Sequence, residues 1–103
     1  MAVVKVGELS EIPEGKAKRI LVKRHPIAVF NCGGQFYAID DTCTHADASL
    51  AEGNFLHDQC QVACPLHGAR FDIKSGEALS LPAVTPVETY KVTVEGTTIF
   101  VEV

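Results

Sequence analysis

Residues 43–67 read CTHADASLAEGNFLHDQCQVACPLH, a stretch that opens and closes with a cysteine and a histidine placed close together. Cys43 and His45 form the first pair, Cys64 and His67 form the second, and eighteen residues separate the two pairs. Thiolate sulfur and imidazole nitrogen both bind transition metals. Each pair therefore predicts half of a metal site, which is complete only if the fold brings the two pairs together.

The sequence around this stretch predicts a β protein. Runs rich in β-branched and aromatic residues alternate with segments that contain glycine or proline. No window shows the period of a long helix, and at most one helical turn is expected, at residues 47–53. Strands are expected at residues 3–9, 17–24, 27–31, 35–40, 87–94 and 97–103.

Turn residues indicate how these strands connect. Cys-Gly-Gly at 32–34 and Glu-Gly at 95–96 each lie between two strand-like runs, which predicts two hairpins. His-Pro at 25–26 is expected to end a strand. A further hairpin over residues 54–63 would bring the two Cys/His pairs together. The expected architecture is a small antiparallel sandwich or barrel that carries two loops.

Length, composition and charge favour an ordinary globular protein. The 103 residues predict a single domain over residues 1–103, and 47% of them are hydrophobic and 21% charged. No apolar run is long enough to span a bilayer. The net charge is -4 and no basic block occurs, so neither nucleic acid nor membrane is an expected partner. The amino terminus resembles no targeting leader, and we expect a cytoplasmic monomer.

Two kinds of metal centre use two cysteines and two histidines. Tetrahedral zinc sites do so, but zinc fingers usually group cysteine with cysteine and histidine with histidine. In a Rieske-type [2Fe–2S] centre, two cysteines hold one iron and two histidines hold the other. Each loop must then supply one ligand to each iron, which is the mixed arrangement found here. The iron–sulfur cluster is therefore favoured over a zinc-stabilised interaction module.

The chain resembles the Rieske [2Fe–2S] family over nearly its whole length. CTH at 43–45, CPLHGARFD at 64–72 and KSGEALSLPA at 74–83 carry the resemblance. It implies an all-β Rieske-like fold, with a barrel-like base and a cluster-binding part over about residues 41–83. It also implies one cluster, whose cofactor and metal ligands would be Cys43, His45, Cys64 and His67.

Two further segments fit the family pattern, and one departs from it. Gly68 would let the second ligand loop turn close to the cluster without a Cβ clash. The segment at 81–83 matches the loop that contains proline and covers the cluster. The stretch between the ligand pairs is somewhat longer than is usual, and the excess is expected near residues 56–60.

The residues around the ligand pairs predict a low reduction potential. High-potential family members carry an extra cysteine in each ligand loop, and this chain has Asp47 and Ala48 after the first pair and Leu66 within the second. Those members also have a hydroxyl side chain and a tyrosine where this chain has Ala69 and Phe71. Without these hydrogen-bond donors, we expect a potential in the lower part of the range from roughly -150 to +300 mV.

A short chain of this kind resembles the ferredoxin component of bacterial aromatic-ring-hydroxylating dioxygenase systems. The resemblance implies a soluble one-electron carrier, not itself an enzyme, between a flavin-dependent NAD(P)H reductase and a terminal Rieske oxygenase. The chain has no GxGxxG motif, and only His25 and His57 remain for a second iron site. The alternative is a small Rieske subunit of a larger oxidoreductase such as nitrite reductase. Such subunits often lack a ligand, whereas this chain keeps all four.

Other residues receive simpler interpretations. Cys32 is expected to be a small buried hydrophobe and Cys60 a structural thiol that is not disulfide-bonded. His25 and His57 are expected to be solvated loop histidines. Arg70 could form a local salt bridge or contact a partner. Docking is expected at the cluster tip, around the two ligand histidines and the proline-containing loop.

Overall fold

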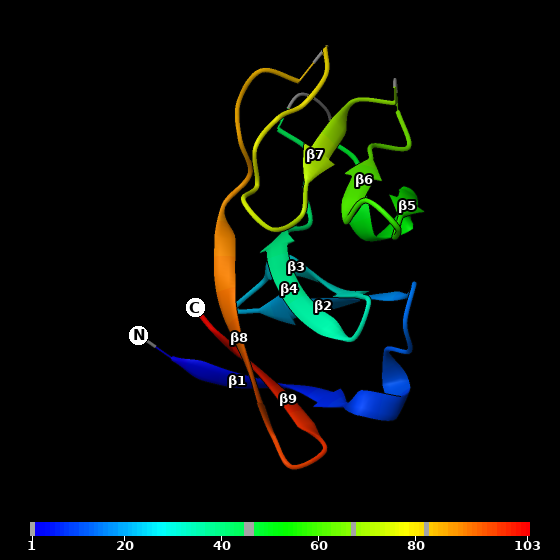
Figure 1. The fold of residues 1–103 in the computed structure, drawn as a ribbon. Coiled ribbons are helices and arrows are strands. Elements are labelled where there is room, and N and C mark those ends of the chain that lie inside the picture. Colours follow the sequence, from blue (N-terminus) through cyan, green and yellow to red (C-terminus); the bar gives the residue numbers. More distant parts are fainter. Residues whose placement is uncertain (1, 45–46, 67, 82) are drawn as a thin grey trace.

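The computed structural model describes residues 2–44, 47–66, 68–81 and 83–103 (Figure 1). These residues form nine strands and two short 3-10 turns, and they contain no α-helix, so the all-β prediction is confirmed. Within them, no helix is long and apolar enough to cross a membrane. The strands are β1 Val3–Glu8, β2 Ala17–Val22, β3 His25–Cys32, β4 Gln35–Asp40, β5 Asn54–Leu56, β6 Gln61–Ala63, β7 Arg70–Asp72, β8 Thr89–Glu95 and β9 Thr98–Glu102. The 3-10 turns are η1 Leu9–Glu11 and η2 Leu50–Glu52.

Six strands form one large antiparallel sheet in the order β1-β9-β8-β4-β3-β2. The sheet curls until its two edge strands face each other, as in a barrel that is nearly closed (Figure 1). Lys18 on β2 donates from Nζ to the carbonyl oxygen of Val6 on β1, at 3.0 Å, across the open seam. The inward side chains form an apolar core of Val6, Ile12, Ile27, Val29, Ala38, Ile99 and Val101.

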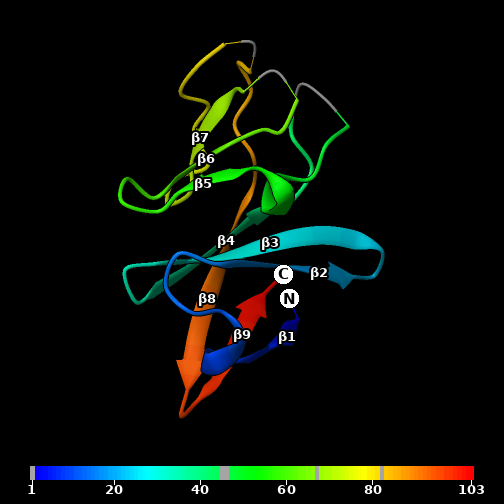
Figure 2. The ribbon, with the colours of Figure 1, turned by 90° about the vertical axis from the view of Figure 1, so that its right-hand side faces the viewer.

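Three short strands form a second sheet, in the order β5-β6-β7, between β4 and β8 in the sequence. Both views place this small sheet and its loops at one end of the molecule and the two chain termini toward the other (Figures 1 and 2). A second core, which includes Phe30, Leu50, Val62, Phe71 and Ile73, joins the small sheet to the large one. The predicted helical turn at 47–53 is present as η2.

Two turns lie at other positions than predicted. His25 and Pro26 begin β3 instead of ending the preceding strand, because the chain turns at Lys23 and Arg24, with φ of 51° and 69°. Non-glycine residues seldom adopt such values, so the sequence offered no turn signal there. Pro26 is tolerated because pairing with β4 begins only at Ile27. In the last hairpin, Glu95 pairs with Thr98, so the turn residues are 96–97 and not 95–96.

Cys32 is buried in the core, as expected, but the expectation that Cys60 is a free thiol is wrong. The two residues form a disulfide, with their Cα atoms 5.5 Å apart, although 28 positions separate them in the sequence. Cys32 ends β3 and Cys60 lies in the turn between β5 and β6, so the bond connects the two sheets. The sequence could not reveal this pairing, because it depends on where the small sheet packs against the large one.

Candidate metal centre

The first ligand loop follows β4 and is closed at its base. Thr42 and Ser49 form an isolated antiparallel bridge, and the Cys43 N–H donates to the Ala48 carbonyl at 3.0 Å. The Cys43 side chain is buried in the core shared by the two sheets. The loop therefore holds Cys43 in a fixed backbone setting and directs its sulfur into the protein.

Asp41 fastens this loop to the large sheet. Its carboxylate is only 2% exposed and accepts hydrogen bonds from Arg19 Nε at 3.0 Å, Ser49 Oγ at 2.9 Å and the Ala51 N–H at 2.9 Å. The Asp41 carbonyl oxygen accepts from the Leu50 N–H as well. Sequence reasoning missed this residue. The sequence showed only a carboxylate two positions before a ligand cysteine. That position alone does not indicate whether the carboxylate is buried and hydrogen-bonded to the loop or exposed to solvent in a turn.

The second ligand loop connects β6 to β7. The Cys64 N–H donates to the Ala69 carbonyl at 2.8 Å, and the Cys64 carbonyl accepts from the Gly68 N–H at 3.2 Å. Gly68 has a φ of 70°, a conformation that side chains with a Cβ rarely adopt. A Cβ built there would meet no described atom within 4 Å, so in the protein itself the requirement for glycine is conformational.

A third segment ties the two ligand loops together. Thr44 donates from Oγ1 to the Thr85 carbonyl at 2.7 Å, which anchors the first loop to this segment. On the other side, the Arg70 N–H donates to Ser80 Oγ and the Leu79 N–H donates to the Arg70 carbonyl. Leu79, Ser80 and Thr85 thus contact the two loops from this segment. Pro82, in the loop at 81–83 that is predicted to cover the cluster, lies outside the described residues.

The two cysteines expected to bind metal share one environment. Cys43 and Cys64 are both buried in the same core, and the disulfide uses the other two cysteines of the chain. His45 and His67 lie outside the described residues. The described residues contain no cluster of three or more His, Cys, Asp or Glu side chains that could hold a metal ion. Within that part of the chain, no other candidate metal site competes with the cysteine pair. Two buried sulfurs on braced loops fit the inner half of a binuclear cluster.

Ala69 and Phe71, which the sequence analysis linked to a low potential, are fully buried beside the second ligand loop. We expect Ala69→Ser to raise the reduction potential, because a hydroxyl donor stabilises the more negative, reduced state. Each kcal/mol of that preference corresponds to roughly 40 mV for a one-electron couple. Spectroelectrochemical titration measures the shift, with Ala78→Ser, at the margin of the same core, as the control. An unchanged or lower potential in Ala69→Ser would contradict the explanation.

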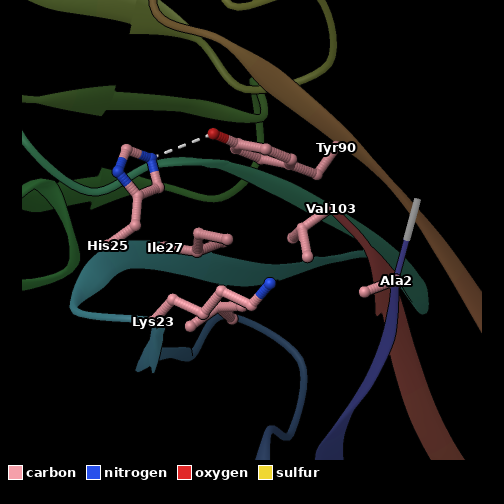
Figure 3. Close-up of a pocket in the computed structure, with 7 residues that line it drawn as sticks. Ala2, Lys23, His25, Ile27, Tyr90 and Val103 are labelled. Atoms are coloured by element: carbon pink, nitrogen blue, oxygen red, sulfur yellow. Dashed lines mark hydrogen bonds between the residues drawn. The ribbon is translucent and has the colours of Figure 1, made fainter.

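The large sheet carries a separate polar cluster beside a pocket of about 560 Å³ near the chain termini (Figure 3). His25 Nε2 lies 2.6 Å from Asp40 Oδ1 and 3.0 Å from the Tyr90 hydroxyl, which itself donates to Asp40. Burial raises the pKa of Tyr90 above its ordinary value, and the hydrogen bond to Asp40 adds to the effect. His25 is thus exposed to solvent, as predicted, but it lies on a strand and in a hydrogen-bonded cluster instead of in a loop. His57 is half exposed in a turn, as expected.

The fold and the paired loops define a class of protein. The sequence pattern of the Rieske [2Fe–2S] domain matches residues 2–91, and the chain belongs to this family. The family assignment confirms the predicted Rieske-type [2Fe–2S] cluster.

Within this family the chain is similar to ferredoxin components of dioxygenase systems. It is 51% identical over 94 residues to the 3-phenylpropionate/cinnamic acid dioxygenase ferredoxin subunit of Escherichia coli (strain K12), which covers 91% of this chain and 87% of that protein. The ferredoxin of carbazole 1,9a-dioxygenase from Nocardioides aromaticivorans IC177 superposes with a TM-score of 0.93 at 37% identity, covering 98% and 97% of the two chains.

A third match comes from an assembly. A chain in the complex of reduced oxygenase and oxidised ferredoxin of carbazole 1,9a-dioxygenase has a TM-score of 0.89 and 37% identity, over 96% of this chain and 91% of that one. These similarities confirm that the chain is a Rieske-type ferredoxin, an electron-transfer component and not a catalytic subunit.

Proposed function

We propose that this ferredoxin carries single electrons from a flavin-dependent NAD(P)H reductase to the terminal oxygenase of an aromatic-ring dioxygenase system. The observation that carries the proposal is the pair of braced loops, each with a buried cysteine, in a chain 51% identical to a dioxygenase ferredoxin subunit. The proposal treats residues 1–103 as one domain with its cluster-binding part at about 41–83. It also includes a monomeric state and a cytoplasmic location.

Within this proposal, Cys43 and Cys64 bind the inner iron as thiolates, and His45 and His67 bind the outer iron through neutral imidazoles. When bound, the cluster accepts and releases one electron at a time. The protein contributes the geometry around it. The hydrogen bonds of the two loops fix the cysteine backbones, and the apolar core around both sulfurs excludes water from that side.

The end of the molecule that carries the ligand loops also presents apolar side chains. Leu81 is 77% exposed and Val84 75% exposed, and Leu66 and Leu79 are exposed beside them. Arg70 directly follows the second ligand loop and is exposed, and it has no ion-pair partner among the described residues. This favours contact with a partner over a local salt bridge. Exposed apolar patches that are surrounded by polar residues are typical of interaction sites. We therefore place reductase and oxygenase docking here.

This docking surface predicts the effect of one added charge. Leu81→Asp is expected to raise the KM of the oxygenase for the ferredoxin about tenfold, the equivalent of about 1.4 kcal/mol, because the carboxylate must be desolvated in the interface. Leu21→Asp is the matched control, since Leu21 is 60% exposed but lies on β2 of the large sheet. Steady-state turnover measures both. Equal KM values in the two variants would rule out docking at this end.

The function itself is tested by electron delivery. Stopped-flow mixing of the protein with an NADH-reduced dioxygenase reductase should reduce it by one electron per chain, and mixing the product with an oxidised terminal oxygenase should reoxidise it. A redox titration should give a one-electron midpoint in the lower part of the family range. A protein that is reduced only as a tightly bound subunit of a larger enzyme would support the alternative instead.

A further inference from the structure

The disulfide between Cys32 and Cys60 occupies a position that matters for the second ligand loop. Cys32 is the last residue of β3 in the large sheet, and Cys60 immediately precedes β6 in the small sheet. β6 leads directly into Cys64, one of the two buried cysteines of the proposed cluster site. The bond therefore anchors the hairpin that carries the second ligand loop to the large sheet.

The bond is nearly buried, but it borders a hollow at the surface. Cys32 is 9% exposed and Cys60 is 4% exposed, and both line a surface hollow of about 300 Å³. Lys74 lines the same hollow together with Glu14, Asp58 and His57, whose ring nitrogen Nδ1 lies 3.3 Å from Asp58 Oδ1. A ligand that fits these charges carries both a carboxylate, for Lys74, and an ammonium group, for the two acidic side chains.

We propose that Cys32–Cys60 is a thiol–disulfide exchange site for a small thiol peptide that carries both charges. The thiolate of one peptide attacks the sulfur of Cys32, the more exposed of the two residues. The S–S bond breaks with release of the Cys60 thiolate, which is then protonated. A second peptide thiolate attacks the mixed disulfide and releases Cys32 as a thiol. Two peptide thiols are oxidised to one disulfide, and their two electrons and two protons reduce the protein bond.

Reduction has a structural consequence at the second ligand loop. Cys60 has a φ of 53°, a conformation that is unfavourable for a residue with a Cβ. The covalent bond to Cys32 holds it there, together with hydrogen bonds from the Cys60 N–H to the His57 carbonyl and from the Ile73 N–H to the Cys60 carbonyl. Reduction removes the covalent restraint, so the turn and the start of β6 open more readily. In the cytoplasmic location that belongs to the proposed function, disulfides are uncommon outside redox-sensing and catalytic roles, which fits a bond that opens reversibly.

The exchange is tested on the holoprotein with glutathione as the probe. Anaerobic samples are equilibrated at several ratios of reduced to oxidised glutathione, quenched in acid, alkylated and analysed by peptide mass spectrometry. Cys32 and Cys60 should become alkylated together in one transition without unfolding. Cys60→Ser should accumulate a mixed disulfide of glutathione with Cys32. A bond that is absent from the isolated protein, or that glutathione opens only after denaturation, would overturn the proposal.

A second measurement tests the consequence for the ligand loop and rests on the proposed function. Cluster loss to a chelator, followed by visible absorption, should be several-fold faster in glutathione-reduced protein than in oxidised protein. The double variant Cys32→Ser/Cys60→Ser should lose its cluster at the fast rate whether glutathione is present or not. Equal rates for oxidised and reduced wild type would overturn the link to the loop. If the protein held no cluster, the proposed function would fail while the alkylation result still decided the exchange site.

Discussion

Replacing His67 with alanine is expected to abolish the EPR signal of the reduced protein and the visible absorption of the oxidised one. The physical reason is that a histidine-bound iron would lose one of its two protein ligands, and an incompletely ligated iron is readily lost from the cluster. EPR after dithionite reduction, with iron and labile sulfide determinations, measures the effect. Cys64→Ala should abolish both signals as well, because it removes a buried thiolate that is proposed to bind the inner iron.

His57 provides the matched control for this experiment. It lies in the turn between β5 and β6, outside both ligand loops, its side chain is half exposed, and its ring nitrogen Nδ1 lies 3.3 Å from Asp58 Oδ1. His57→Ala should therefore keep about two irons and two labile sulfides per chain. A full-intensity signal in His67→Ala would show that the proposed ligand assignment is wrong. One zinc per chain in the wild type would contradict the cluster itself.

Replacing Asp41 with alanine is expected to lower the free energy of unfolding by about 3 kcal/mol. The substitution removes the acceptor for Arg19, Ser49 and the Ala51 N–H, and hydrogen bonds to a charged group contribute roughly 1.5–3 kcal/mol each. Arg19 is half exposed and can be hydrated in the variant, which keeps the loss below the simple sum. Thermal unfolding followed by circular dichroism should show a midpoint lowered by more than about 10 °C.

Two further variants distinguish the loss of the Asp41 hydrogen bonds from the loss of a negative charge in general. Asp58→Ala removes a carboxylate that is almost fully exposed and should change the stability by less than about 0.5 kcal/mol. Asp41→Asn keeps an acceptor for Ser49 and Ala51 but loses the ion pair with Arg19, so its midpoint should lie between those of wild type and Asp41→Ala. Similar unfolding midpoints for Asp41→Ala and Asp58→Ala would show that the Asp41 hydrogen bonds do not stabilise the fold.

The sequence allowed prediction of features that depend on local chemistry. The Gly-Gly turn after Cys32 is present because glycine readily adopts the positive φ values, 63° and 93°, that this turn requires. The alternation of apolar residues predicted the main strands, and the paired motifs predicted which loops carry the cysteines. The hairpin over 54–63 is present as β5 and β6.

Features that depend on packing between distant segments could not be predicted. β7 has only three residues and is a strand because it pairs with β6, not because of its own composition. In the sequence, Asp41 is indistinguishable from an ordinary turn carboxylate. Its role depends on Arg19, which lies on a strand 22 positions earlier and donates a hydrogen bond to it. The disulfide is of the same kind, because it joins residues that lie 28 positions apart.

The pairing of β4 with β8 has a consequence for how such proteins can diversify. Ala38 lies opposite Tyr90 and Ile39 opposite Thr89, so the chain leaves the large sheet and returns to it at neighbouring points. The segment between β4 and β8, which includes the small sheet and both ligand loops, is thus one insertion into the large sheet. The two strands that flank this insertion are already joined by main-chain hydrogen bonds. Insertions, deletions and substitutions within this segment can adapt the docking surface of an electron carrier to new partners, while the large sheet keeps its strand register and its core.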